Sequence, residues 1–134
     1  MPELDAATRA FLEAPGRFAT IATIDPDGSP LQAVVWYQLR DDGSMLINSL
    51  VGRRWPENLM RDPRMSVTVE HGYDYVAMRG VTEQLHGGAA AVADILALAA
   101  RYESGEELER RARGFRTQAR VSFVFRARTL LVHH

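Results

Sequence analysis

The sequence contains neither cysteine nor lysine, and each absence removes a class of chemistry. Without cysteine the chain has no disulfide, no thiolate-bound metal and no thiolate nucleophile. Without lysine it cannot form a Schiff base with a carbonyl substrate. All 16 cationic residues are arginine, a bias that codon usage in a GC-rich genome explains. A phosphate bound by a cationic side chain would therefore be bound by a planar guanidinium.

Long hydrophobic runs and an excess of one charge are also missing. No apolar stretch approaches the roughly 20 residues of a membrane span, and the first residues, MPELDAATRAF, lack the pattern of a signal peptide. We therefore expect a cytoplasmic protein without membrane contact. The formal net charge is −1, so we expect no binding of nucleic acid. The 134 residues, 46% of them hydrophobic, fit a single domain, residues 1–134.

Changes in hydrophobic periodicity divide the chain into short strands and a few helices. Asp25-Pro26-Asp27-Gly28 is a strong turn signal, and Gly80 within a strand pattern suggests a β-bulge or a close approach of another backbone. Strands are predicted at residues 18–24, 31–39, 45–50, 65–70, 75–85 and 121–125, with 129–133 as a candidate continuation. Helices are predicted at residues 4–13, 88–102 and 106–113, with a further short helix that begins at Pro56. This order indicates an α+β protein, mainly an antiparallel β-barrel.

The usual catalytic templates are absent. There is no G-x-S-x-G nucleophile elbow, no P-loop and no dinucleotide-binding glycine pattern. None of the four histidines has the i, i+4 partner of a helical zinc site. The aspartates at 25, 27, 41 and 42 lie in turn signals. We therefore expect no metal site and assign no catalytic side chain.

The segment from Asn48 to Arg64 contains the clearest candidate site. A strand that ends in Asn48-Ser49 leads into Arg53-Arg54 and then into a helix. Guanidinium groups and free backbone N–H groups at a helix N-terminus suit an anion. The alternative is a solvated arginine pair in a loop. Trp36 and Tyr37 point to opposite faces of a neighbouring strand, so one of them could face a planar ligand; core packing is the alternative for Trp36.

The order of these segments resembles a known superfamily. The hairpin TIDPDGSPLQAVVWY, the strand end INS, the stretch GRRWPENLMRDPRMSVTVE and the strand YVAMRGVTEQL are similar to the pyridoxamine 5'-phosphate oxidase-like, FMN-binding split barrels. Within them the chain most resembles the actinobacterial oxidoreductases that use the deazaflavin coenzyme F420. The resemblance covers about Phe18 to Leu85, and more loosely the chain to Tyr102.

The resemblance implies a six-stranded split β-barrel and a homodimer with the cofactor at the subunit interface. It places the cofactor phosphate at Ser49, Arg53, Arg54 and Asn58, beside Asn48, and the cofactor ring against Gln32, Val34 and Trp36. Trp55 stands where these families usually have a lysine. Two interpretations of Trp55 follow: an aromatic wall against the cofactor, or a hydrophobic contact with Leu59 or Met60 that anchors the short helix.

The implied activity is hydride transfer from coenzyme F420 to a small or planar unsaturated substrate. The alternatives are an FMN-dependent enzyme of the same fold and a flavin- or deazaflavin-binding protein without turnover. In such enzymes the cofactor performs the chemistry, which agrees with the missing acid and base residues. For the dimer we expect an apolar sheet face that includes some of Val34, Trp36, Val67 and Val69. The alternative is that these residues fill the barrel interior.

Overall fold

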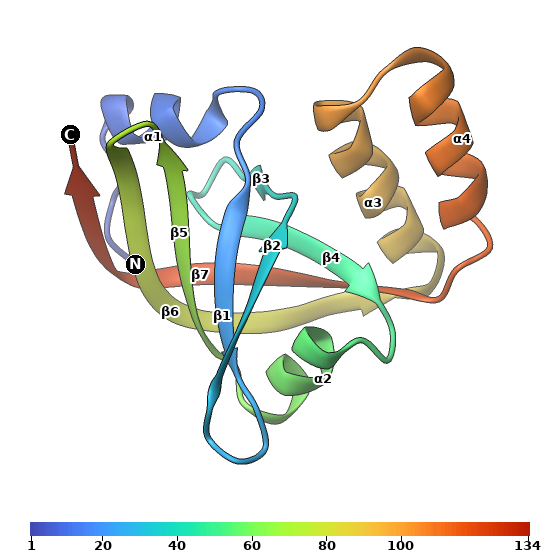
Figure 1. The fold of residues 1–134 in the computed structure, drawn as a ribbon, viewed down its shortest axis with the longest axis horizontal. Coiled ribbons are helices and arrows are strands. Elements are labelled where there is room, and N and C mark those ends of the chain that lie inside the picture. Colours follow the sequence, from blue (N-terminus) through green and yellow to red (C-terminus); the bar gives the residue numbers. More distant parts are fainter.

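Seven antiparallel strands form the frame of the protein, and four helices pack around it (Figure 1). The computed structural model describes residues 1–134. The strands are β1 (Ala19–Ile24), β2 (Pro30–Val35), β3 (Gln38–Leu39), β4 (Met45–Leu50), β5 (Arg64–His71), β6 (Asp74–Gly87) and β7 (Arg120–His133). The helices are α1 (Ala6–Glu13), α2 (Arg54–Arg61), α3 (Gly88–Tyr102) and α4 (Gly105–Phe115). The strand order in the sheet is β2-β1-β5-β6-β7-β4-β3.

The two long strands β6 and β7 give the sheet its barrel shape. Each has 14 residues, and they pair with one another along most of their length. The first part of β6 also pairs with β5, and the first part of β7 with β4. The sheet therefore curves into a partly closed barrel, with α1 and α2 at opposite ends and α3 and α4 together on one side (Figure 1). The predicted split-barrel fold is confirmed, with the two-residue β3 as a seventh strand.

The barrel interior is the hydrophobic core, and strand alternation selects the residues that fill it. Ile21 of β1, Val67 of β5 and Met78 of β6 are cross-strand neighbours and all point inward. The opposite sheet face carries short side chains between Val34 and Leu131, which are 69% and 59% exposed. Of the four residues considered for a dimer face, Val34 lies there, and Trp36 follows the end of β2 and stacks on Tyr102 of α3. Val67 and Val69 belong to the core, as their alternative interpretation stated.

One predicted strand, residues 31–39, is divided in the structure. β2 pairs with β1, whereas β3 pairs with β4, so the chain changes partner at Trp36 and Tyr37. Tyr37 is fully buried, and its hydroxyl donates to the carbonyl of Leu12 at 2.5 Å. The backbone groups of Tyr37 bond to side chains of α3: its N–H donates to the Tyr102 hydroxyl and its carbonyl accepts from Arg101 Nε. These bonds replace the strand ladder and allow the chain to turn.

The other differences are at element ends. Pro56 is the third residue of α2 rather than the first, since the helix begins at Arg54. A proline is tolerated there because first-turn N–H groups lack acceptors within the helix. The candidate continuation at 129–133 is part of one unbroken strand, β7.

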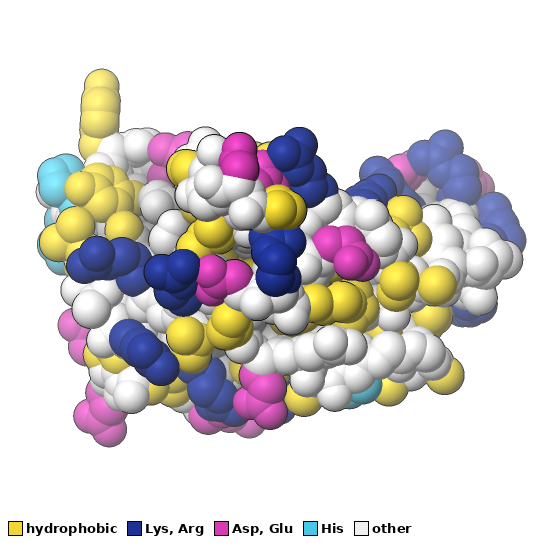
Figure 2. All heavy atoms as spheres, turned by 90° about the horizontal axis from the view of Figure 1, so that it is seen from below, with side chains coloured by type: hydrophobic (Ala, Val, Ile, Leu, Met, Phe, Trp, Pro, Cys, Tyr) yellow, Lys and Arg dark blue, Asp and Glu magenta, His cyan; other side chains and the backbone are white.

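The molecular surface is mixed in charge. In Figure 2 arginine side chains are interspersed with acidic and apolar side chains on the face shown. No helix is both long enough and apolar enough to cross a bilayer.

Gly80 provides a test of the barrel curvature. The register between β6 and β7 shifts between Arg79 and Gly80, as expected for a bulge. A Cβ atom at position 80 would lie 2.1 Å from the carbonyl oxygen of Arg126. We expect Gly80→Ala to lower the free energy of unfolding by about 1–3 kcal/mol, measured by urea denaturation.

The matched control is Gly114→Ala in α4, where a Cβ atom meets nothing within 4 Å. This variant should be unchanged or more stable by up to about 1 kcal/mol, because alanine favours helix. A Gly80→Ala protein as stable as wild type would contradict the close approach of β6 and β7.

Candidate functional site

A cleft of about 470 Å³ lies between β2 and β4, where the barrel is open. β2 and its extension contribute residues 33–36, and β4 contributes residues 48–50. The remaining lining residues are Arg53, Trp55, Ile95, Arg111, Phe115, Gln118 and Arg120. We call this cavity the β2–β4 cleft. The cleft exists because the chain changes partner at Tyr37. β2 pairs with β1, and the two-residue β3 pairs only with the start of β4, so β2 and β4 are not paired with one another.

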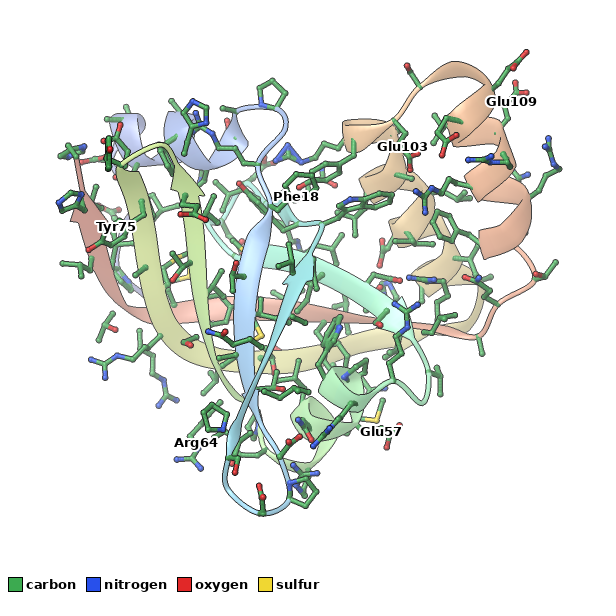
Figure 3. All side chains as sticks on the ribbon, in the orientation of Figure 1. Phe18, Glu57, Arg64, Tyr75, Glu103 and Glu109 are labelled. Atoms are coloured by element: carbon green, nitrogen blue, oxygen red, sulfur yellow. The ribbon has the colours of Figure 1, made fainter.

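Aromatic packing fixes one wall of the cleft. Trp36 stacks on Tyr102 with ring centres 5.1 Å apart and planes at 8°. Phe18, at the entrance to β1 (Figure 3), stacks on Tyr102 as well, at 5.2 Å. The guanidinium of Arg111 lies 5.7 Å from the Trp36 ring centre, and Arg111 also pairs with Glu103 at the end of α3 (Figure 3). Trp36 is therefore a rigid wall whose orientation depends on α3 and α4.

Arg120 gives the cleft its buried positive charge. It is only 6% exposed, and no carboxylate pairs with its guanidinium. Its Nε donates to Asn48 Oδ1 at 2.8 Å and its Nη1 to Gln118 Oε1 at 2.7 Å. Burial, and to a lesser degree the nearby Arg53, lower the pKa of Arg120 to about 10. The group is thus still charged at neutral pH, and an anion in the cleft would stabilise it.

The remaining polar groups of the cleft also suit an anion. Arg53 lies immediately before α2 and has no acidic partner. No aspartate or glutamate lines the cleft. Ser49 Oγ is buried and has no hydrogen-bond partner within the protein. A buried hydroxyl without a partner is unfavourable, and a ligand acceptor at this position would remove that penalty.

Six of the nine predicted site residues line the β2–β4 cleft: Val34, Trp36, Asn48, Ser49, Arg53 and Trp55. Trp55 is 7% exposed and belongs to the core cluster together with Leu59, with its ring centre 6.0 Å from that of Phe123. Met60 is exposed and outside that cluster. Trp55 thus packs in the core with Leu59 of α2 and also borders the cleft. Its role as an aromatic wall against the cofactor stays a prediction.

The other three predicted residues, Gln32, Arg54 and Asn58, lie outside the cleft. Gln32 is on the outer sheet face, opposite Ala22. Arg54 forms two hydrogen bonds with Asp25, Nε to Oδ1 at 3.0 Å and Nη2 to Oδ2 at 2.5 Å. Asn58 is buried and donates to Asp25 Oδ1 at 2.9 Å. Arg54 and Asn58 therefore tie α2 to the β1–β2 turn.

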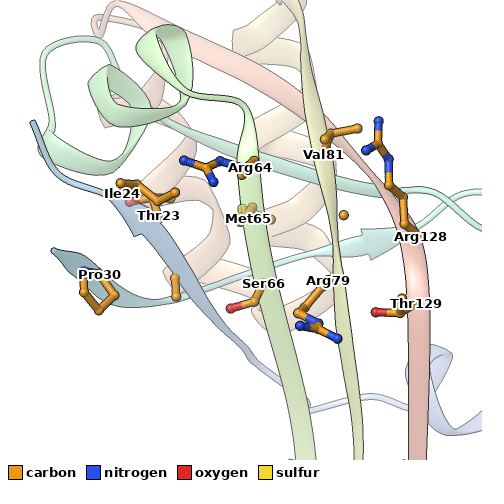
Figure 4. Close-up of a pocket in the computed structure, with 12 residues that line it drawn as sticks. Thr23, Ile24, Pro30, Arg64, Met65, Ser66, Arg79, Val81, Arg128 and Thr129 are labelled. Carbon is orange, nitrogen blue, oxygen red and sulfur yellow. The ribbon is translucent and has the colours of Figure 1, made fainter. Parts of the chain in front are cut away.

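A second cavity, of about 520 Å³, lies on the outer face over β1, β5, β6 and β7 (Figure 4). Three arginines border it: Arg64, Arg79 and Arg128. Arg64 is paired with Asp62 at 2.7 Å. The three guanidinium groups point away from one another rather than toward a common centre (Figure 4). This cavity is therefore a weaker candidate for an anion than the β2–β4 cleft.

Sequence reasoning missed eight cleft residues. Four of them come from α4 or from the chain that follows it: Arg111, Phe115, Gln118 and Arg120. Arg120 directly precedes the apolar strand VSFVF, where an arginine normally marks a solvated strand end. The other three come from α4 and the loop after it. Only the tertiary packing of α3 and α4 brings them beside β2, and no local pattern encodes that packing.

Comparisons with known proteins agree with this fold. The family model described as pyridoxamine 5'-phosphate oxidase matches residues 4–132. A conserved hypothetical protein from Mycobacterium tuberculosis is 27% identical, with a TM-score of 0.77 over 97% of this chain and 84% of the other. A structure named F420 reductase is 24% identical, with a TM-score of 0.73 over 98% of both chains. The heme storage protein HutZ from Vibrio cholerae shares the fold at 15% identity, with a TM-score of 0.69 over 98% and 95%. No curated protein matches the sequence.

The Asp25 contacts predict an acid-dependent contribution to stability. The hydrogen bond from Asn58 is the largest influence and lowers the pKa of the Asp25 carboxyl below its ordinary 3.8; burial opposes this effect and Arg54 adds to it. A lowered folded-state pKa stabilises the fold above the unfolded-state value, and this stabilisation is lost as the pH falls through the folded-state value.

We therefore expect Asp25→Asn to unfold at lower denaturant concentration than wild type at neutral pH. The difference should shrink as the pH drops below 3.8, in urea titrations across that range. A difference that stays constant with acidification would mean that the Asp25 charge does not stabilise the turn.

Proposed function

Because the chain belongs to the pyridoxamine 5'-phosphate oxidase family, we propose that it is an oxidoreductase with a flavin-type cofactor in the β2–β4 cleft. The observation that carries the proposal is the buried guanidinium of Arg120, which has Arg53 nearby and no carboxylate beside it. The partnerless hydroxyl of Ser49 lines the same cleft. Two cations and a free hydroxyl suit the phosphate that coenzyme F420 and FMN both carry.

Coenzyme F420 is the first candidate and FMN the alternative. The structure named F420 reductase has the same fold and motivates the deazaflavin. The family name points to FMN-type cofactors. Both are planar ring systems with a phosphate on a side chain, so both match a cleft with an aromatic wall and a cationic end.

Each group in the cleft has a defined task in this proposal. When bound, the cofactor supplies the hydride for reduction of a small or planar unsaturated substrate. Arg120 and Arg53 bind its phosphate, and Ser49 donates a hydrogen bond to it. Trp36, held by Tyr102, limits the position of the ring and excludes water from that side. The proton that completes the reduction comes from solvent, because no aspartate, glutamate or histidine lines the cleft.

Titration of the purified protein with F420 and with FMN tests the proposal directly. We expect micromolar or tighter binding of at least one cofactor, followed by oxidation of the bound reduced form when an unsaturated acceptor is added. Arg53→Ala should weaken binding roughly ten- to a hundredfold, the effect of losing a charged hydrogen bond of about 1.5–3 kcal/mol.

Arg54→Ala is the matched control, because Arg54 is the adjacent arginine but bonds to Asp25 outside the cleft. Its cofactor affinity should equal that of wild type. Equal cofactor affinities for wild type and Arg53→Ala would show that Arg53 does not bind the phosphate. Binding without turnover of any acceptor would favour a cofactor-binding protein over an enzyme.

We also propose that the protein is a homodimer that associates through the outer sheet face and shares the cofactor between subunits. Val34, Thr20, Thr68, Ala77 and Leu131 form one row across this face. The row has exposed apolar residues at both ends and short side chains between them. Because Val34 also lines the β2–β4 cleft, a second copy on this face would extend over the cleft.

Light scattering coupled to size exclusion tests this assembly. Wild type should elute with twice the mass of one chain, and Thr68→Arg, in the middle of the row, should be monomeric. Met60→Arg, at an exposed apolar position in α2 that does not line the cleft, should remain dimeric. A wild-type mass of one chain at micromolar concentration would contradict the dimer.

A further inference from the structure

A series of hydrogen bonds leads from Arg120 away from the β2–β4 cleft and across the barrel wall; we call it the hydrogen-bond chain. Asn48 Nδ2 donates to Ser122 Oγ at 2.9 Å and to the carbonyl of Ala91 at 2.8 Å. Ser122 Oγ donates to Asp94 Oδ2 at 2.6 Å. His86 Nε2 lies 2.5 Å from the same carboxylate oxygen. The hydrogen-bond chain thus runs from Arg120 in the β2–β4 cleft, through β4, β7 and α3, to His86 at the end of β6.

The chemistry of its members fixes the direction of each hydrogen bond. Arg120 Nε can only donate, so the oxygen of the Asn48 amide must face it. The Asn48 nitrogen then faces Ser122, and the Ser122 proton is free to bond to Asp94. The Asp94 carboxylate can only accept, from both Ser122 and His86. The donors of Arg120, Asn48 and Ser122 therefore all point from Arg120 toward Asp94, so these three bond dipoles add.

The burial of the hydrogen-bond chain makes this alignment energetically important. Ser122 is fully buried, and Asn48 and Arg120 are each less than 10% exposed. In a low-dielectric interior, aligned hydrogen bonds polarise one another, and a broken bond leaves a buried polar group without a partner. The nearest negative charge along these bonds is Asp94, since no carboxylate contacts Arg120 directly.

We propose that Asp94 is a positioning residue that acts through Ser122 and Asn48 to hold the Arg120 guanidinium toward the phosphate of the bound cofactor. The inference rests on the proposed function and deepens it. Asn48 is then part of the support for Arg120 rather than a cofactor contact, because its amide nitrogen and oxygen are already bonded. His86 is 34% exposed and stabilises the Asp94 carboxylate from the far side.

The ligand test compares cofactors with and without phosphate. We expect Asp94→Asn and Ser122→Ala each to weaken FMN roughly five- to tenfold by calorimetric titration, and riboflavin less than twofold. For F420 the comparison is the same deazaflavin without its phosphate side chain. The double variant should be no weaker than the stronger single variant, because both changes break the same hydrogen-bond chain.

The control is Asp62→Asn, which removes a carboxylate paired with the surface residue Arg64 and should change no affinity. Equal loss of FMN and riboflavin binding in Asp94→Asn would indicate a general structural role and overturn the inference. Unchanged FMN binding in both Asp94→Asn and Ser122→Ala would overturn it as well.

A second measurement keeps the two proposals apart. The Arg120 Nε–H is buried and bonded to Asn48, so NMR should detect its slow hydrogen exchange in the protein without ligand. Asp94→Asn and Ser122→Ala should accelerate this exchange roughly tenfold or more, and Asp62→Asn should not. If wild type binds none of the ligands, the proposed function fails. In that case the exchange rates alone decide whether Asp94 positions Arg120.

Discussion

A buried cation without a carboxylate beside it is the constraint on which the site depends. The fold withdraws Arg120 from water and places it against Phe115, with only the neutral side chains of Asn48 and Gln118 as hydrogen-bond partners. Such a group destabilises the protein until an anion approaches it. Arg53 increases the positive potential at the same point. The cleft is therefore organised to receive negative charge.

The cleft that Arg120 lines depends on a single departure from regular sheet structure. If β2 and β3 formed one continuous strand, that strand could not pair with β1 along one part and also leave the β2–β4 cleft open. Tyr37 prevents this, because its side chain is buried under α1 and its backbone is bonded to Arg101 and Tyr102. The same Tyr102 holds Trp36 against the cleft. Tyr37 and Tyr102 therefore determine both the core packing at this point and the shape of the cleft.

Local patterns were sufficient to predict most of the frame. The strand at 45–50 and the helix end at 102 match the structure, because alternation and helical spacing are local properties. The division at Tyr37 was not predictable, since the apolar pattern continues through it and only contacts with α1 and α3 interrupt the ladder. For the candidate site, Arg53 could be proposed because it stands just before a helix start and Ser49 was assigned by resemblance, whereas Arg120 was missed because its burial depends on α4. Asn58 was assigned to the site by resemblance; in the structure its side chain donates to Asp25, outside the β2–β4 cleft.

A crystal structure of the protein with FMN or coenzyme F420 bound would test the central claim most directly. The account predicts the phosphate in the β2–β4 cleft, within hydrogen-bonding distance of Arg120, with Ser49 Oγ directed at the ligand. A phosphate bound instead in the outer-face cavity, among Arg64, Arg79 and Arg128, would contradict it.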